Sequence, residues 1–148
     1  MLDRGWSVFA TDAQQEAIDR LRARVGDRPN LRAVRSPMED VELPPADLVW
    51  ASFSLFFCDP ARFPDVWDRI EAAVAPAGLF AGHLLGERDT WAADPTKSSF
   101  TRPDVEALFA GWAIERFDVE DEDGEAWSVP KHWHVYEVVA RKPAAAPA

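Results

Sequence analysis

The sequence lacks the features that mark several large classes of protein. It has one cysteine among 148 residues, so no internal disulfide forms, which fits a reducing cytoplasm. Its 16 lysines and arginines are outnumbered by 26 aspartates and glutamates, and the net charge of −10 repels a phosphate backbone. No apolar run reaches the roughly 20 residues that span a bilayer, and no signal peptide follows Met1. We expect a cytoplasmic protein of one domain, with no nucleic-acid and no membrane partner.

Glycine is also scarce, and its placement excludes one kind of nucleotide site. The seven glycines contain no G-x-G pair, so the phosphate-cradling loop typical of dinucleotide-binding enzymes is absent. Tryptophan, by contrast, occurs seven times, and 47% of the residues are hydrophobic. This composition is sufficient for one core and indicates either aromatic-lined pockets or a bulky interior.

The spacing of apolar residues predicts alternating strands and helices. We expect strands over 6–10, 31–34, 47–52 and 79–85, and helices over 13–25 and 61–75 with a third beginning at 101–104. Strands over 112–119 and 131–140 then flank an acidic turn, 120–125, with Asp123 and Gly124 at its tip. The order predicts an α/β sheet with helices on both faces, completed by a C-terminal antiparallel strand pair. The Pro/Ala-rich tail, 143–148, is predicted to be disordered.

Local signals define several element ends. Asp12, followed by Gln15, fits a helix N-cap with its capping partner, and Thr101 with Asp104 fits a second capping box. The segment 76–78, Pro-Ala-Gly, predicts a turn before the strand at 79–85.

Two groups of residues suggest chemistry. Asp12 ends the first strand, where an acid in a doubly wound sheet often binds ribose hydroxyls, and this role is compatible with an N-cap role. His132 and His134 are two residues apart on a predicted strand and therefore point to one face. With Cys58 or His83 they would provide zinc ligands, but the spacing does not require zinc and strand packing is the favoured interpretation, so no metal is predicted.

Several segments together resemble a known family. The segments 8–12 (Val-Phe-Ala-Thr-Asp), 36–40 (Ser-Pro-Met-Glu-Asp) and 46–52 (Ala-Asp-Leu-Val-Trp-Ala-Ser) resemble the second to fourth strands of class I S-adenosylmethionine-dependent methyltransferases. The segments 52–58, 86–91 and 131–134 resemble the bacterial branch related to tellurite-resistance methyltransferases. The resemblance extends from Trp6 to Lys142.

The resemblance implies a three-layer Rossmann-like sheet that lacks its first strand and helix. The family's first strand and glycine-rich loop would precede Met1, so residues 1–142 would form an incomplete methyltransferase domain. The centre of the sheet would then be unpaired, and an unpaired apolar strand favours association, here as a homodimer.

The resemblance also implies a binding site for S-adenosylmethionine and a small-molecule substrate. Asp12 would bind the cofactor's ribose, and Met38 and Glu39 would lie at the adenine, although Pro37 stands where the family usually has an acid. The methionine end would be lined by three residues after the third strand: Ser52, Phe53 and Phe56. For Phe53 and Phe56, packing in the core is an equal alternative. The substrate side would include Asp89, Trp91 and His132, with His83 or His134 as the proton acceptor.

Three functions follow for comparison. The first is methyl transfer from S-adenosylmethionine to a small molecule, which depends on alignment and water exclusion more than on a strong acid or base. The second is a non-catalytic truncated remnant that acts as a binding or dimerising module. The third, a nicotinamide-dependent enzyme, is disfavoured because no glycine-rich loop is present.

Overall fold

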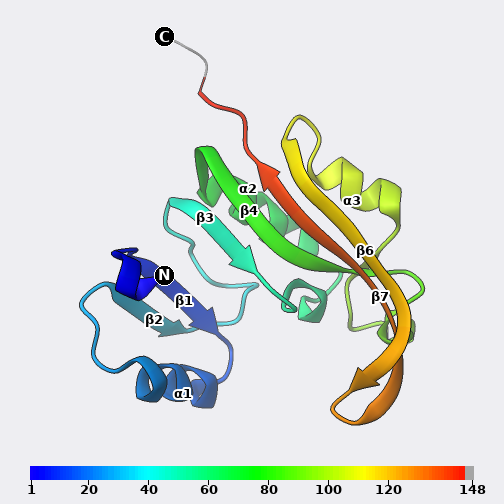
Figure 1. Cartoon of the computed structure of the whole chain (residues 1–148), viewed down its shortest axis with the longest axis horizontal. Helices are drawn as coiled ribbons and strands as arrows, with labels where there is room; N and C mark the ends of the chain where they lie inside the picture. Colours follow the sequence, from blue (N-terminus) through cyan, green and yellow to red (C-terminus); the bar gives the residue numbers. More distant parts are fainter. Residues whose placement is uncertain (146–148) are drawn as a thin grey trace. The chain divides into compact units, whose positions relative to one another are not determined.

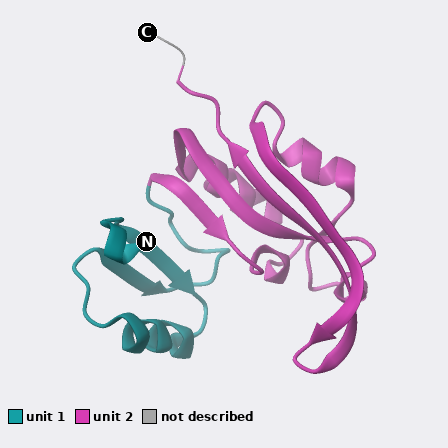
Figure 2. Cartoon of the chain, viewed as in Figure 1, with its two compact units in different colours: residues 1–44 teal, residues 45–148 magenta. Residues whose placement is uncertain are grey.

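In the computed structural model, which describes residues 1–145, the chain divides into two compact units (Figure 2). Unit 1 is Met1–Pro44 and unit 2 is Pro45–Ala148. Unit 1 contains, in chain order, η1 (Leu2–Arg4), β1 (Val8–Asp12), α1 (Gln15–Val25) and β2 (Leu31–Arg35). The two strands are parallel, with Val8 opposite Leu31 and Asp12 opposite Arg35.

Helix α1 begins later than predicted. Its N-cap is Gln14, which makes no side-chain cap, so the predicted capping pair of Asp12 and Gln15 is wrong. The reason is that β1 continues to Asp12, two residues beyond its predicted end. The Asp12 carboxylate instead accepts a hydrogen bond from the Gln14 N–H at 2.8 Å and shapes the turn before the helix.

Unit 2 is built around a mixed five-stranded sheet (Figure 1). The strand order is β3-β4-β7-β6, in which β3 runs parallel to β4 while β7 is antiparallel to both of its neighbours; the short β5 pairs with the end of β4. The elements are β3 (Ala46–Ala51), η2 (Leu55–Phe57), α2 (Phe63–Ala73), β4 (Val74–Gly86), η3 (Thr90–Ala93), β5 (Ser99–Phe100), α3 (Arg102–Leu108), β6 (Ala113–Ala126) and β7 (Val129–Arg141).

The core of unit 2 lies between this sheet and helices α2 and α3. Phe80 on β4 is fully buried, and its ring centroid lies 5.3 Å from Trp67 of α2 and 5.3 Å from Phe109 just after α3. Figure 1 shows α2 behind β4 and α3 beside β6 in that view. Burying an aromatic side chain of this size contributes about 1.5–3 kcal/mol, so this contact fixes the helices on one face.

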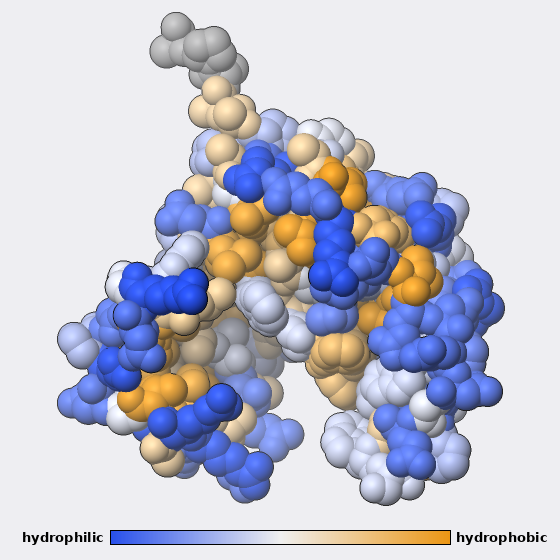
Figure 3. Space-filling model, in the orientation of Figure 1, coloured by the Kyte–Doolittle hydropathy of each residue, from blue (hydrophilic) through white to orange (hydrophobic). Residues whose placement is uncertain are grey.

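The strand register determines which residues share the face of the unit 2 sheet opposite to α2 and α3. Residues directly opposite one another in an antiparallel pair point to the same side, and β4, β7 and β6 place His83, Glu137 and Asp118 in one such row. The next row is Leu85, Val135 and Glu120. On the side drawn in Figure 3, hydrophilic side chains dominate the right-hand margin along the β6–β7 hairpin.

The hairpin corrects one prediction. The acidic segment 120–125 is not a turn but part of β6, and Gly124 pairs with Lys131. The turn is formed by Trp127 and Ser128, whose φ values of 50° and 64° are those that a two-residue hairpin turn of type I′ requires. Two carboxylates of this segment, those of Asp121 and Asp123, have a basic partner across the hairpin in His132.

The predicted turn at 76–78 is likewise inside a strand. β4 starts at Val74, and the chain passes through an irregularity at which Ala77 has φ 61° and the pairing with β3 shifts register. The Gly78 carbonyl accepts the Lys142 N–H at 2.9 Å, and the Pro143 carbonyl accepts the Ala77 N–H at 3.2 Å. The predicted disordered tail begins at this last contact, and 146–148 lie outside the described residues.

The main fold predictions are confirmed. Apart from the short β5, which was not predicted, the order of strands and helices, the α/β class and the C-terminal antiparallel pair are as expected, and Thr101 and Asp104 form the predicted capping box. Within the described residues, β1 and β3 each pair with one strand only. No helix in that part of the chain is both long and apolar enough to cross a membrane.

Candidate functional site

In unit 1 the predicted adenosine-binding residues gather at the carboxyl end of the two strands. The Ser36 N–H donates to the Asp12 carbonyl at 2.9 Å, which brings the start of the segment containing Met38 and Glu39 next to Asp12. The Asp12 side chain is exposed, and one oxygen accepts the Gln14 N–H. Within the described chain its second carboxylate oxygen has no hydrogen-bond partner, so this oxygen is available to a hydroxyl group.

In unit 2 the residues after β3 separate into two environments. Phe56 is 1% exposed and packs with Leu85 and Val135. Of its two predicted alternatives, the structure therefore shows packing in the core. Phe53 is 42% exposed and has φ 47°, a conformation that bulky residues rarely adopt. This backbone turns the Phe53 ring onto His83, which it stacks on at 4.1 Å between centroids.

His83 has an unusual environment. Its Nδ1 atom is the one buried side-chain nitrogen or oxygen in the described part of the chain that lacks a hydrogen-bond partner. Burial lowers the pKa of the His83 imidazole, and nearby Glu137 and Glu120 oppose that effect. The ring is therefore neutral at pH 7, the form that can accept a proton.

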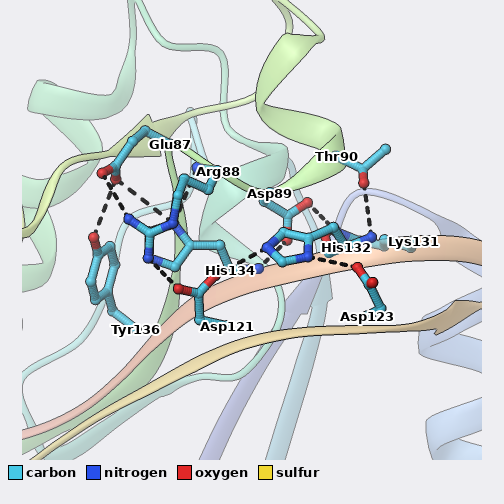
Figure 4. Close-up of polar contacts among 10 residues, drawn as sticks. All are labelled: Glu87, Arg88, Asp89, Thr90, Asp121, Asp123, Lys131, His132, His134 and Tyr136. Atoms are coloured by element: carbon cyan, nitrogen blue, oxygen red, sulfur yellow. Dashed lines mark hydrogen bonds and ion pairs between the residues drawn. The ribbon is translucent and has the colours of Figure 1, made fainter.

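The predicted substrate-side loop after β4 is held on β7 by a buried ion pair (Figure 4). The side chains of Asp89 and Lys131 are 0% and 2% exposed, and Lys131 Nζ donates to Asp89 Oδ1. Asp89 also accepts the Trp91 N–H at 2.9 Å and the His134 N–H at 3.0 Å. Asp89 therefore fixes the loop.

Aromatic rings enclose the lysine of this pair. Lys131 Nζ lies 4.4 Å from the centroid of the Trp91 ring and 4.0 Å from that of Trp133, distances typical of cation–π contacts. Two indoles, two charges and the loop backbone thus form one packed cluster. The sequence analysis missed Lys131, because a lysine in a strand normally indicates an exposed position.

His134 and His132 each interact with charged residues of the protein and are not arranged to bind one metal ion together. Buried His134 accepts the Arg88 N–H on Nδ1 at 3.1 Å, and the Arg88 side chain contacts Asp121 of β6. His132 lies between Asp123, 2.8 Å from Nδ1, and Asp121, 3.0 Å from Nε2 (Figure 4). Among the described residues no group of three or more His, Cys, Asp or Glu side chains is arranged to hold a metal ion.

These environments predict how the three histidines titrate. Burial lowers the pKa of His134 and of His83 below 6.5, whereas hydrogen bonds to Asp123 and Asp121 raise the pKa of His132 above it. Protonated His134 is less favourable in the folded protein than in the unfolded chain, so this residue lowers the free energy of unfolding as the pH falls below about 6.5. His132 stabilises the fold below that pH and loses its contribution as the pH rises through its folded pKa.

Titration of the imidazole NMR signals measures the three pKa values, and the variants His132→Gln and His134→Gln assign the signals. We expect the highest pKa for His132, and a lowest pKa for His132 would contradict the prediction.

Comparison with known proteins identifies the family to which the chain belongs. A family model described as a methyltransferase domain matches residues 1–82, more than half of the sequence. The chain belongs to the methyltransferase domain family. No curated protein matches this methyltransferase.

Solved methyltransferases share its fold at low identity. An S-adenosylmethionine-dependent methyltransferase from Methanosarcina mazei is 13% identical with a TM-score of 0.71, over 97% of this chain and 85% of that one. TehB from Haemophilus influenzae is 11% identical with a TM-score of 0.76, over 93% of this chain and 50% of that one. NodS from Bradyrhizobium japonicum WM9, in complex with S-adenosyl-L-homocysteine, is 12% identical with a TM-score of 0.71, over 91% and 66%. These comparisons support an enzyme whose cofactor is S-adenosylmethionine.

The residues present fit part of this cofactor. In unit 1, Asp12, with a free carboxylate oxygen at the strand ends, suits a ribose hydroxyl. In unit 2, taken by itself, the exposed Phe53 ring suits a cationic group. The described chain contains no glycine-rich loop for the methionine carboxylate.

Proposed function

We propose that this methyltransferase transfers a methyl group from S-adenosylmethionine to a small molecule. The observation that carries the proposal is the edge of unit 1 at which Asp12, hydrogen-bonded through its carbonyl to Ser36, presents a free carboxylate oxygen beside the segment of Met38 and Glu39. A carboxylate there accepts hydrogen bonds from ribose hydroxyls, and the neighbouring segment forms the adenine side.

The chain's own residues would mainly orient the reactants. S-adenosylmethionine supplies a methyl group that is already activated by the positive charge on sulfur. In the proposal Ser52 and Phe53 line the methionine end, since they follow β3 directly, and the aromatic face of Phe53 stabilises a neighbouring cation. The loop fixed by Asp89 and Lys131 excludes water on the acceptor side.

Calorimetric titration with S-adenosylmethionine tests the cofactor site. We expect saturable binding that weakens about tenfold in Asp12→Asn, because the amide keeps the hydrogen bond to the Gln14 N–H but loses the charge that strengthens bonds to hydroxyls. Asp27→Asn, an exposed acid of the same unit, is the matched control and should bind as the unaltered chain does. An absence of binding at millimolar cofactor, or equal affinities for the three proteins, would contradict the proposal.

A second candidate function is a dimerising module without catalysis. The outer edge of β3 has no strand partner in the described chain, and Trp50 on this strand is 65% exposed. Such an edge pairs readily with a second copy. In sedimentation experiments a dimer that becomes monomeric in Trp50→Lys would support this function, whereas a monomer at all concentrations would exclude it.

A further inference from the structure

The surroundings of Phe53 restrict the chemistry of the methyl acceptor, and this inference rests on the proposed function. If the methyl group lies beside Phe53, the acceptor must lie beside it too, because transfer is in line. The rings of unit 2 that contact Phe53 are the stacked His83 ring, the Trp133 ring, whose centroid is 6.0 Å away, and the buried Phe56 ring at 6.2 Å.

An aromatic row leads away from this point. We give this name to Phe53, Trp133, Trp91 and Trp127, which contact one another in that sequence. The centroids of Trp133 and Trp91 are 5.6 Å apart, and Trp91 stacks on Trp127 at 5.4 Å. Trp127 is 82% exposed, so the row extends from the proposed methyl position to solvent. Successive rings of the row are inclined at 83°, 64° and 26° to one another, so they offer an aromatic partner both ring faces and ring edges.

The charges beside the row are acidic. The register places Glu120 and Glu122 on the side of the sheet that carries His83 and Trp133, and neither glutamate makes an ion pair within the described chain. Glu137, directly opposite His83, pairs with Arg116 at 3.3 Å. Free carboxylates next to aromatic faces attract a cation and repel an anion.

The basic side chains near the row all have acidic partners. Lys131, beneath Trp91 and Trp133, is buried against Asp89. Lys97, whose Nζ is 5.4 Å from the Phe57 centroid, pairs with Asp94 at 3.2 Å. No cation is therefore left on this surface of the described chain to bind a phosphate, carboxylate or oxyanion substrate.

One polar atom at this position lacks a partner. Nδ1 of His83 is buried without a hydrogen bond, and Phe53 covers the ring. A buried nitrogen without a partner costs about 1–3 kcal/mol, and because Nδ1 is out of a ligand's reach, a proton from a ligand would be taken at the other ring nitrogen, Nε2. A neutral imidazole is also the group that removes a proton from an ammonium ion near neutral pH.

We propose that the methyl acceptor is an amine carried by an aromatic ring, with the ring on the aromatic row and the ammonium group toward Glu120 and Glu122. His83 takes a proton from the ammonium. The freed nitrogen lone pair then bonds to the methyl carbon while the carbon–sulfur bond breaks, leaving its electron pair on sulfur. The product is a methylated ammonium and a neutral thioether, and His83 returns its proton to water.

Three single-ring probes of similar size, which differ in charge, test this proposal on the full chain: benzylamine, benzyl alcohol and benzoate. Binding is followed through the NMR signal of the His83 imidazole, which His83→Gln identifies. We expect saturable binding of benzylamine with a shift of this signal, at least tenfold weaker binding of benzyl alcohol, and none of benzoate. Binding of benzoate as tightly as benzylamine, or no saturation by any probe, would overturn the proposal.

Matched variants locate the charge effect. Glu120→Gln should weaken benzylamine binding about threefold, the scale of one exposed ion pair, whereas Glu71→Gln, an exposed acid on α2, should not change it. Equal effects in both variants would overturn the placement of the ammonium group.

Cofactor binding is measured separately by calorimetry. A chain that selects benzylamine but does not bind S-adenosylmethionine would contradict the proposed function, whereas one that binds the cofactor without selecting benzylamine would contradict only the acceptor class.

Discussion

Lys131→Met is expected to lower the free energy of unfolding by about 3–5 kcal/mol. The substitution leaves the Asp89 carboxylate buried without its cation, and an uncompensated buried charge is strongly destabilising. Methionine is close to lysine in length, so the loss reflects the charge more than the packing. Lys97→Met is the matched control: its partner Asp94 is 45% exposed, and an ion pair of that kind contributes at most about 1 kcal/mol.

Urea unfolding at neutral pH measures both variants. The double substitution of Lys131→Met with Asp89→Leu should recover much of the loss, because a buried ion pair replaced by apolar side chains is often neutral in stability. A loss of less than 1 kcal/mol in Lys131→Met would mean that Asp89 does not depend on this lysine. Trp fluorescence should also change in Lys131→Met, since two indoles contact the ammonium group.

Gly86→Ala should be the next most damaging change, at about 2–4 kcal/mol. A Cβ at Gly86 would overlap the ring of His134, which is 1% exposed and has little room to move. Displacing the ring combines the cost of overpacking, about 1–3 kcal/mol, with the loss of the hydrogen bond from the Arg88 N–H, about 0.5–1.5 kcal/mol.

A double-mutant cycle isolates this contact. In a His134→Ala background the ring is absent, so adding Gly86→Ala should cost much less than it does in the unaltered chain. Purely additive effects would show that the glycine is needed for its backbone and not for the space it leaves. The readout is again the free energy of unfolding from urea titration.

Much of the fold could be predicted because its signals are local. The alternation of strands and helices follows from the spacing of apolar residues, and the capping box at Thr101 follows from two side chains three residues apart. The end of β1 is predicted less well: the expected strand ends at residue 10, whereas β1 extends to Asp12, the candidate ribose acid.

The parts that could not be predicted depend on contacts between distant segments. Lys131 is buried because Asp89, 42 residues away, comes to meet it, and no local pattern distinguishes it from an exposed lysine. The acidic segment of β6 suggested a turn, yet Arg88 and His132 supply partners for Asp121 and Asp123. The stacking of Phe53 on His83 requires a left-handed backbone at Phe53 that its sequence does not favour.

The tight connection between β6 and β7 has a consequence for how the chain folds. Trp127 and Ser128 adopt positive φ without the Asn-Gly pair that makes such a connection form early. Nucleation at this end is therefore slow, and zippering of the long hairpin starts elsewhere, where apolar residues such as Phe117 and Val138 face each other across the strands. We therefore expect the exposed end of the hairpin, which carries the 82% exposed indole of Trp127, to form late and to fray early during unfolding.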